Sequence, residues 1–158
     1  MYLASRCDEI LIMGHAFKLS TSPWPDYDRV ILFDGLCNMC NAFVDWVIKH
    51  DPEGRFAFAP LQSESAQCLL KQLGLKTQDF ETFLYLEHDS VFIKSTAALQ
   101  ILRAMKTRWS CVGKFLAVIP CPIRDAVYDW IVKHRYCLMG KRKICRVPSV
   151  GEQHRFLR

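Results

Sequence analysis

The sequence lacks a long hydrophobic run. Its best apolar stretch, residues 115–119, stops at Pro120, whereas a helix that crosses a bilayer needs about 20 apolar residues. Asp8 and Glu9 lie near the start of the chain, where a secretory signal has a basic segment followed by an unbroken apolar one. There is also no internal repeat and no low-complexity tract. We therefore expect a cytoplasmic protein without a transmembrane segment.

Closely spaced cysteines are also scarce. The chain has eight Cys among 158 residues, below the density of a disulfide-stapled mini-protein, and only Cys37 and Cys40 form a close pair. Three others, Cys68, Cys111 and Cys121, are expected to be small core residues. In a reducing compartment a single Cys-x-x-Cys is typical of catalysis or metal binding rather than of a structural disulfide.

The Cys pair follows an apolar segment. Residues 30–33 (Val-Ile-Leu-Phe) predict a buried strand, Asp34 begins a turn, and apolar positions at helical spacing predict a helix that ends before Pro52. Cys37 would then lie at a helix N-terminus, where free amides and the helix dipole favour a thiolate. Cys40, one turn later, would lie beneath it, so that one sulfur is exposed and the other is shielded.

The order of the later elements predicts the fold class. The helix after the Cys pair is followed by a strand, a helix, two tightly joined strands and another helix. A β-α-β crossover gives parallel strands and a hairpin adds antiparallel ones. The resulting order, β-α-β-α-β-β-α with a Cys-x-x-Cys after the first strand, is that of a thioredoxin-like α/β domain. The predicted ranges of these later elements are 55–59, 63–74, 82–86, 91–93 and 95–105.

The segments on either side of this core differ in character. Residues 1–28 have weak periodicity and are expected to be a poorly ordered extension, whereas residues 29–108 are expected to form the thioredoxin-like redox core. Residues 109–158 are expected to be a helical, basic extension packed on the same domain. Within it we predict a short helix over 109–119 and a longer one over 123–134 that has a proline just before its first turn.

Positive charge is concentrated in the last quarter of the chain. Residues 121–158 hold nine Lys and Arg against three Asp and Glu, although the whole chain has a net charge of only +5. Such a segment forms either a solvated face or a contact with an acidic partner. Charge alone does not specify nucleic acid, so no specific nucleic-acid partner is expected.

Further motifs accompany the pattern Asp34-x-x-Cys37-x-x-Cys40. Together, over residues 29–148, they resemble the DCC family of thiol-disulfide oxidoreductase-like proteins, which is named for that pattern. The resemblance implies a thioredoxin-like fold and a disulfide oxidoreductase role. The motifs are Asp51-Pro52-Glu53-Gly54 with Phe56, Leu61-Gln62-Ser63, Lys94-Ser95-Thr96-Ala97-Ala98, Ile119-Pro120, Arg124-Asp125-x-x-Tyr128, Gly140-Lys141-Arg142 and Cys145-x-x-Pro148.

The spacing of the Cys pair suits thiol-disulfide exchange. The reaction needs an attacking thiolate and a nearby second thiol that resolves the mixed disulfide. We expect Cys37 to attack and Cys40 to resolve, with a protein or small-molecule thiol or disulfide as the partner and no organic cofactor. Asp34 either orients or deprotonates one of the thiols, or is simply a turn or cap residue.

One feature of thioredoxin-like enzymes is absent. Those enzymes resemble one another in a cis-proline before the third strand, which faces the Cys pair and holds the substrate backbone. This chain has no proline between Pro60 and Pro120, so Thr82 is the candidate at that position. Ser95 and Thr96 are interpreted first as helix caps and second as residues of the same substrate groove.

Two other functions remain open from the sequence. A structural zinc or iron-sulfur site needs four ligands, and His134, Cys137 and Cys145 would have to fold back onto the Cys pair to supply them. The other alternative is a redox-inactive thioredoxin-like interaction module. Cys145, in a Cys-x-x-Pro segment, is also a candidate third thiol for exchange.

Overall fold

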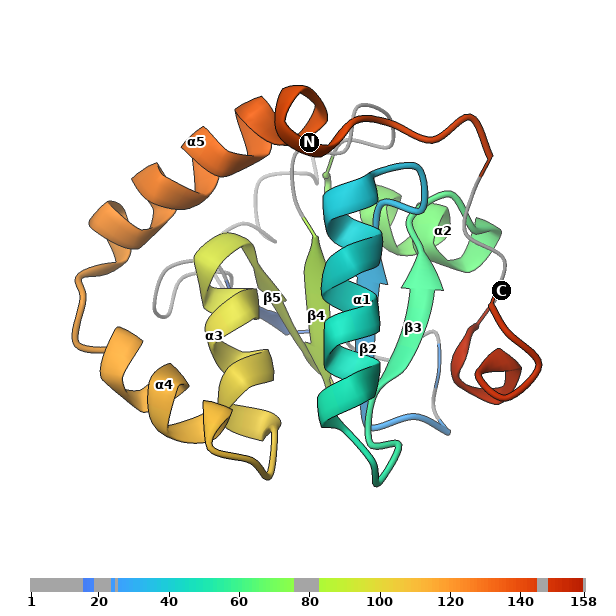
Figure 1. The fold of residues 1–158 in the computed structure, drawn as a ribbon, viewed down its shortest axis with the longest axis horizontal. Coiled ribbons are helices and arrows are strands. Elements are labelled where there is room, and N and C mark those ends of the chain that lie inside the picture. The colour runs from blue at the N-terminus through green and yellow to red at the C-terminus, as the bar shows by residue number, and fades with distance from the viewer. Residues whose placement is uncertain (1–15, 19–23, 25, 76–82, 145–147, 158) are drawn as a thin grey trace, which may run out of the picture.

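A mixed β-sheet lies at the centre of the structure (Figure 1). The computed structural model describes residues 16–18, 24, 26–75, 83–144 and 148–157. Within these residues five strands pair in the order β1-β5-β4-β2-β3. The strands are β1 (Ala16–Lys18), β2 (Arg29–Phe33), β3 (Ala57–Pro60), β4 (Leu84–Glu87) and β5 (Ser90–Ile93).

The topology confirms the predicted fold class. Strands β2 and β3 are parallel and are joined through a helix, whereas β4 pairs antiparallel with both β2 and β5. The chain therefore has a thioredoxin-like α/β fold, built from the predicted β-α-β-α-β-β-α order. The boundaries of β3 and β4 lie one to two residues later than the sequence predicted.

Helices cover both faces of this sheet. Successive strand residues point to opposite faces, so Val30 and Leu32 pack with α2, whereas Ile31 and Phe33 pack with α1 and α3. These four residues of β2 are at most 1% exposed, which explains why the strand is apolar at every position after Arg29. The helices are α1 (Asn38–His50), α2 (Glu64–Gln72), α3 (Lys94–Ala104), α4 (Trp109–Leu116), α5 (Cys121–Met139) and the short 3-10 helix η1 (Gln153–Arg155).

The segment before β2 contains more structure than its sequence indicated. Ala16–Lys18 pair antiparallel with β5 and add a fifth strand to the sheet. Trp24 is buried and belongs to the core cluster on the α2 side. Both lie within residues 1–28, whose periodicity is weak because a three-residue edge strand is too short to show an alternating pattern.

Two of the cysteines expected in the core are exposed, so that prediction was wrong for Cys68 and Cys111. In α2 the buried positions are Ala66, Leu69 and Leu70, and Cys68 projects away from that stripe because successive helical residues are rotated by about 100°. In α4 only one residue, a glycine, is buried. Cys121 is partly buried.

The last long helix, α5, is five residues longer at its C-terminal end than predicted. It ends at Met139, and its C-cap is Gly140, whose φ of 76° lies in the left-handed region that favours glycine. Figure 1 shows α5 crossing the upper left of the molecule, with α4 below it on the same flank. Of the helices in the described residues, none is both long enough and apolar enough to cross a membrane.

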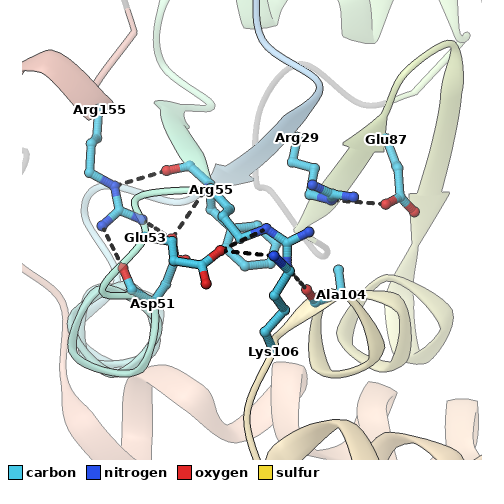
Figure 2. A network of polar contacts seen from close by, with 9 residues as sticks. Arg29, Asp51, Glu53, Arg55, Glu87, Ala104, Lys106 and Arg155 are labelled. Carbon is cyan, nitrogen blue, oxygen red and sulfur yellow. Dashed lines mark hydrogen bonds and ion pairs between the residues drawn. The ribbon is translucent and has the colours of Figure 1, made fainter.

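The described part of the C-terminal tail is anchored to the sheet edge by a buried ion pair. The guanidinium of Arg155 pairs with the carboxylate of Asp51 and donates a hydrogen bond of 2.9 Å to the carbonyl of Phe56 (Figure 2). Beyond it, the amide of Leu157 donates to the carbonyl of Phe58 in β3 at 2.8 Å. These contacts close the end of α1 and partly cover the edge strand.

Candidate active site

The candidate site lies at the edge of the sheet where β2 ends. The register pairs Phe33 with Pro60 and Leu32 with Leu84, and Leu84 in turn with Ile93. The ends of β2, β3 and β5 and the beginning of β4 therefore meet at one edge. The residues that follow β2, β3 and β5 are brought together there although they are far apart in sequence.

Cys37 is the N-cap of α1. Its backbone is extended, with φ −88° and ψ 120°, and its Sγ accepts a hydrogen bond from the amide of Cys40 at 3.4 Å. Cys37 is fully buried, whereas Cys40 is partly exposed. The sequence correctly predicted that Cys37 lies at the start of the helix. It also predicted Cys40 beneath Cys37, whereas in the structure Cys37 is the buried residue and Cys40 is the more exposed one.

The surroundings of the pair separate the acidities of the two thiols. The pKa of Cys37 is lowered to about 6, chiefly by the hydrogen bond from the Cys40 thiol, with further contributions from the Cys40 amide and the positive charge of Arg135. Burial opposes this effect. The same contact with Cys37, together with burial, raises the pKa of Cys40. At neutral pH the pair therefore holds one thiolate, on Cys37, and one thiol, on Cys40.

Asp34 is the centre of a buried polar network behind the pair. Its Oδ1 accepts hydrogen bonds from the side chain of Gln62 at 2.7 Å and from the amide of Leu36 at 3.0 Å. Its Oδ2 accepts from the hydroxyl of Tyr136 at 2.6 Å and lies 3.6 Å from the guanidinium of Arg135. Burial and this bond to Asp34 raise the pKa of Tyr136 to about 12, so at neutral pH the tyrosine keeps its proton and its hydroxyl donates a hydrogen bond to the carboxylate.

Two asparagines hold the loop around Cys37. The buried side chain of Asn41 donates to the carbonyls of Gly35 and Cys37 at 3.0 and 2.7 Å, which fixes the turn at the start of α1. Asn38 instead contacts the C-terminal end of α5. Its side-chain Nδ2 donates to the carbonyl of Met139 at 2.8 Å.

The segment that follows α5, residues 140–142, lies against the Cys pair, and we call it the strap. Lys141 forms an isolated antiparallel bridge with Cys37. The amide of Arg142 donates to the carbonyl of Leu36 at 2.7 Å, and its Nε donates to the side-chain oxygen of Asn38 at 2.7 Å. The strap thus contributes to the burial of Cys37.

Ser95 lies at the same sheet edge but is held by the first half of α5. It does not cap α3, which begins at Lys94 with Ile93 as its N-cap and without a side-chain cap, so the capping prediction was wrong for Ser95. The Ser95 hydroxyl donates to the carboxylate of Asp125. Asp125 precedes Arg135 by ten residues, about 15 Å along a helix, so Ser95 and the Cys pair contact different parts of α5.

The other residues of the predicted groove are placed less directly. Thr96 lies in the first turn of α3 rather than at its N-cap, so the capping prediction was wrong for Thr96 too, and its side chain is partly exposed. Thr82 lies outside the described residues, but its neighbour Phe83 donates its amide to the hydroxyl of Tyr128 in α5 at 3.1 Å. The aromatic ring of Phe83 also packs on Phe43 of α1, with ring centroids 5.5 Å apart. The start of β4 is therefore enclosed by α1 and α5.

The ligands that a metal site would require are not gathered in the described part of the chain. No group of three or more His, Cys, Asp or Glu residues there is placed to hold a metal ion. His134 lies with its Nδ1 2.7 Å from the carbonyl of Trp130, and Cys137 is exposed. Cys145, which is also the candidate third thiol, lies outside the described residues.

Sequence reasoning missed the partners of Asp34. Gln62 was named only within a short motif, and Arg135 and Tyr136 were treated as part of a basic extension. The sequence around Arg135 and Tyr136 contains no motif that indicates a contact with Asp34, because an Arg-Tyr pair in a helix is common. The link between the Asp34-x-x-Cys37 motif and Arg135 could be found from sequence only if the two occurred together in many related proteins.

The sequence is similar to known proteins over most of its length. The model of a family described as DCC1-like thiol-disulfide oxidoreductase matches residues 31–141. The chain is 46% identical over 130 residues to the uncharacterized protein YuxK of Bacillus subtilis, covering 82% of this chain and 94% of that protein. It is 33% identical over 129 residues to the DCC family protein At1g52590, chloroplastic, of Arabidopsis thaliana, covering 80% of this chain and 75% of that protein. No solved structure matches the chain.

Proposed function

The chain belongs to the DCC1-like thiol-disulfide oxidoreductase family, and from that membership we propose that it exchanges dithiols and disulfides through Cys37 and Cys40. The observation that carries the proposal is the separation of the two thiol pKa values at one helix N-terminus. A pair that is half ionised at neutral pH holds both the nucleophile and the proton that exchange requires.

In the reducing direction, the Cys37 thiolate attacks one sulfur of a substrate disulfide. A Cys37–substrate disulfide forms, the substrate S–S bond breaks, and the other substrate sulfur leaves as a thiolate. Cys40 then attacks the Cys37 sulfur, which releases the second substrate thiolate and leaves a Cys37–Cys40 disulfide. Two electrons pass from the protein dithiol to the substrate, and the Cys40 proton goes to a leaving thiolate. The oxidising direction is the reverse sequence.

The charge on Cys37 controls when Cys40 reacts. While Cys37 is a thiolate, its contact raises the pKa of Cys40 and keeps that residue protonated. Once Cys37 is bonded to the substrate, it carries no charge and no longer accepts that hydrogen bond. The pKa of Cys40 then falls, and the resolving step follows.

We assign Asp34 a positioning role. Its carboxylate holds Arg135 and Tyr136 in place, and Arg135 contributes positive charge that favours the Cys37 thiolate. Because Asp34 Oδ1 also accepts from the amide of Leu36 in the turn, one carboxylate serves both the turn and the positioning of Arg135 and Tyr136. Replacing the carboxylate therefore loosens the turn and these two side chains.

Access to Cys37 requires the strap to move. Lys141 and Arg142 pair with the backbone of the Cys37 loop, and Cys37 is fully buried in their presence. We propose that a protein or small-molecule disulfide reaches Cys37 when residues 140–142 separate from Leu36 and Asn38. We propose that the substrate groove beyond the strap includes Thr82, Ser95 and Thr96.

We also expect the protein to act in the cytoplasm.

Three serine variants test the proposal. Purified protein is reduced, freed of reductant and mixed with an oxidised model substrate such as insulin, and free thiols and protein adducts are followed over time. We expect Cys37→Ser to abolish exchange and Cys40→Ser to accumulate a mixed disulfide, detected as a mass increase that reductant reverses. The matched control is Cys68→Ser, an exposed thiol on α2, which should retain full activity. Unchanged activity in Cys37→Ser would refute the proposal.

A further inference from the structure

Helix α5 is polar on its buried side and apolar on its exposed side. Asp125 and Arg135 face the sheet edge and are at most 9% exposed. Val127 and Trp130, on the side turned away from Asp125, are 55% and 58% exposed, and Leu138, one turn after Arg135, is 58% exposed. A helix that only covers a core shows the reverse distribution, with its polar residues facing water.

The exposed apolar residues form a stripe rather than a scatter. Ile123, Val127, Trp130 and Leu138 follow one another at intervals of four, three and eight residues, which places them within one narrow arc of a helix. Phe115 and Val118, at and just beyond the end of α4, are 75% and 81% exposed. We call these six residues the outer α4–α5 surface; α4 and α5 lie together on one flank (Figure 1).

Positive charge predominates in the segment that carries this surface. Residues 109–144 contain seven Lys and Arg but only two Asp and Glu, and of the seven only Arg135 is buried and Arg124 partly buried. Lys114 in α4 and Lys133 in α5 are exposed, as are residues 141–143 after α5. Of the two acidic residues, Asp125 is buried and Asp129 is paired with Lys94 at 3.0 Å.

We propose that the outer α4–α5 surface binds the face of an anionic lipid bilayer, with both helices lying in the plane of the membrane. Apolar side chains with a central tryptophan enter the boundary between head groups and acyl chains, while flanking lysines meet the lipid phosphates. This occupant fits the charge better than a second copy of the chain does, because two copies that joined through this surface would bring two positive rims together.

Vesicle binding by the full-length protein tests the proposal. The protein is sedimented with vesicles made of equal parts of phosphatidylglycerol and phosphatidylcholine, and with vesicles of phosphatidylcholine alone. We expect binding to the anionic vesicles, and we expect it to weaken at high salt because the screening length falls from about 10 Å at 0.1 M to about 3 Å at 1 M. Absence of binding to the anionic vesicles would overturn the proposal.

Two variants separate the apolar and the charged contributions. Val127→Ser/Trp130→Ser should weaken binding by about tenfold or more, because two large apolar side chains no longer enter the lipid. Its matched control is Val150→Ser, which changes a residue that is 87% exposed in another segment. Lys114→Glu/Lys133→Glu should weaken binding to anionic vesicles by more than about tenfold, whereas Lys71→Glu on α2 should not.

A conservative variant guards against misfolding of these proteins. Trp130→Phe keeps an aromatic ring at this position. The difference in tryptophan fluorescence between parent and variant gives the emission of Trp130 alone, and this emission should shift to shorter wavelength on anionic vesicles. None of these changes touches the thiols, so insulin reduction should be unaffected and tests the redox proposal separately. Binding that is unchanged in Val127→Ser/Trp130→Ser would overturn the lipid assignment. The lipid assignment would also be overturned if the protein formed a concentration-dependent dimer through this surface, or if it bound an acidic protein but no vesicles.

Discussion

Replacing Cys40 with alanine should raise the pKa of Cys37. The largest contribution to the low pKa of Cys37 is the hydrogen bond from the Cys40 thiol, and alanine removes that donor. With a pKa of about 6, Cys37 is about nine-tenths ionised at pH 7, whereas a thiol with the reference pKa of 9.0 is about one-hundredth ionised. The backbone amide at position 40 and the charge of Arg135 are retained in the variant, so the pKa should rise only part of the way.

Serine at the same position provides the matched control. Its hydroxyl can donate a hydrogen bond to the Cys37 sulfur, so Cys40→Ser should shift the pKa of Cys37 less than Cys40→Ala does. Both variants remove the resolving thiol, and a difference between them therefore reports the hydrogen bond itself. The expected order of Cys37 pKa values is parent lowest, serine intermediate and alanine highest.

The titration is followed by thiolate absorbance near 240 nm in the reduced protein. The signal of a Cys37→Ser protein is subtracted, which removes the contribution of the other cysteines. Peptide mapping after brief alkylation at several pH values confirms that the titrating group is Cys37. A midpoint that is the same in parent and Cys40→Ala would show that the Cys40 thiol does not stabilise the thiolate.

Three further substitutions test the ion pair at the C-terminal end of α1 and two contacts near the Cys pair. Arg155→Met should lower the free energy of unfolding by about 3–5 kcal/mol, measured in urea, because it leaves Asp51 buried without its cation; Arg155→Met/Asp51→Leu should recover part of the loss. Tyr136→Phe should lower the free energy of unfolding by about 1 to 3 kcal/mol, because the carboxylate of Asp34 loses one hydrogen-bond donor. Equal stability of variant and parent would contradict the assigned contact. Arg142→Ala should loosen the strap and speed alkylation of the nucleophilic thiol at fixed pH, whereas an unchanged rate would mean that the strap does not limit access.

Much of the fold follows from local patterns in the sequence. The apolar run at 30–33, the proline and glycine breaks and the tight turn before Val91 predict the elements and their order, because strand and helix periodicities differ. The pattern fails where an element is short or atypical. Ala16–Lys18 become a strand only because β5 offers an unpaired edge, and α5 continues to Met139 although its sequence is polar on the side that is buried.

The sequence by itself determined where the two thiols of the pair lie. Two cysteines separated by two residues, placed where an apolar strand turns into a helix, are sufficient to predict a thiolate at the helix N-terminus and a second thiol one turn away. This inference is local, because the spacing and the helix dipole both act within a few residues of Cys37.

The tertiary structure alone decided what surrounds the pair. Arg135 and Tyr136 reach Asp34 from about a hundred residues further along the chain, and Lys141 lies on Cys37 because α5 crosses the sheet edge. These contacts depend on how helices pack, which no nearby residue encodes. They determine which thiol is buried, whereas the sequence by itself determined only that two thiols lie one helical turn apart at the start of a helix.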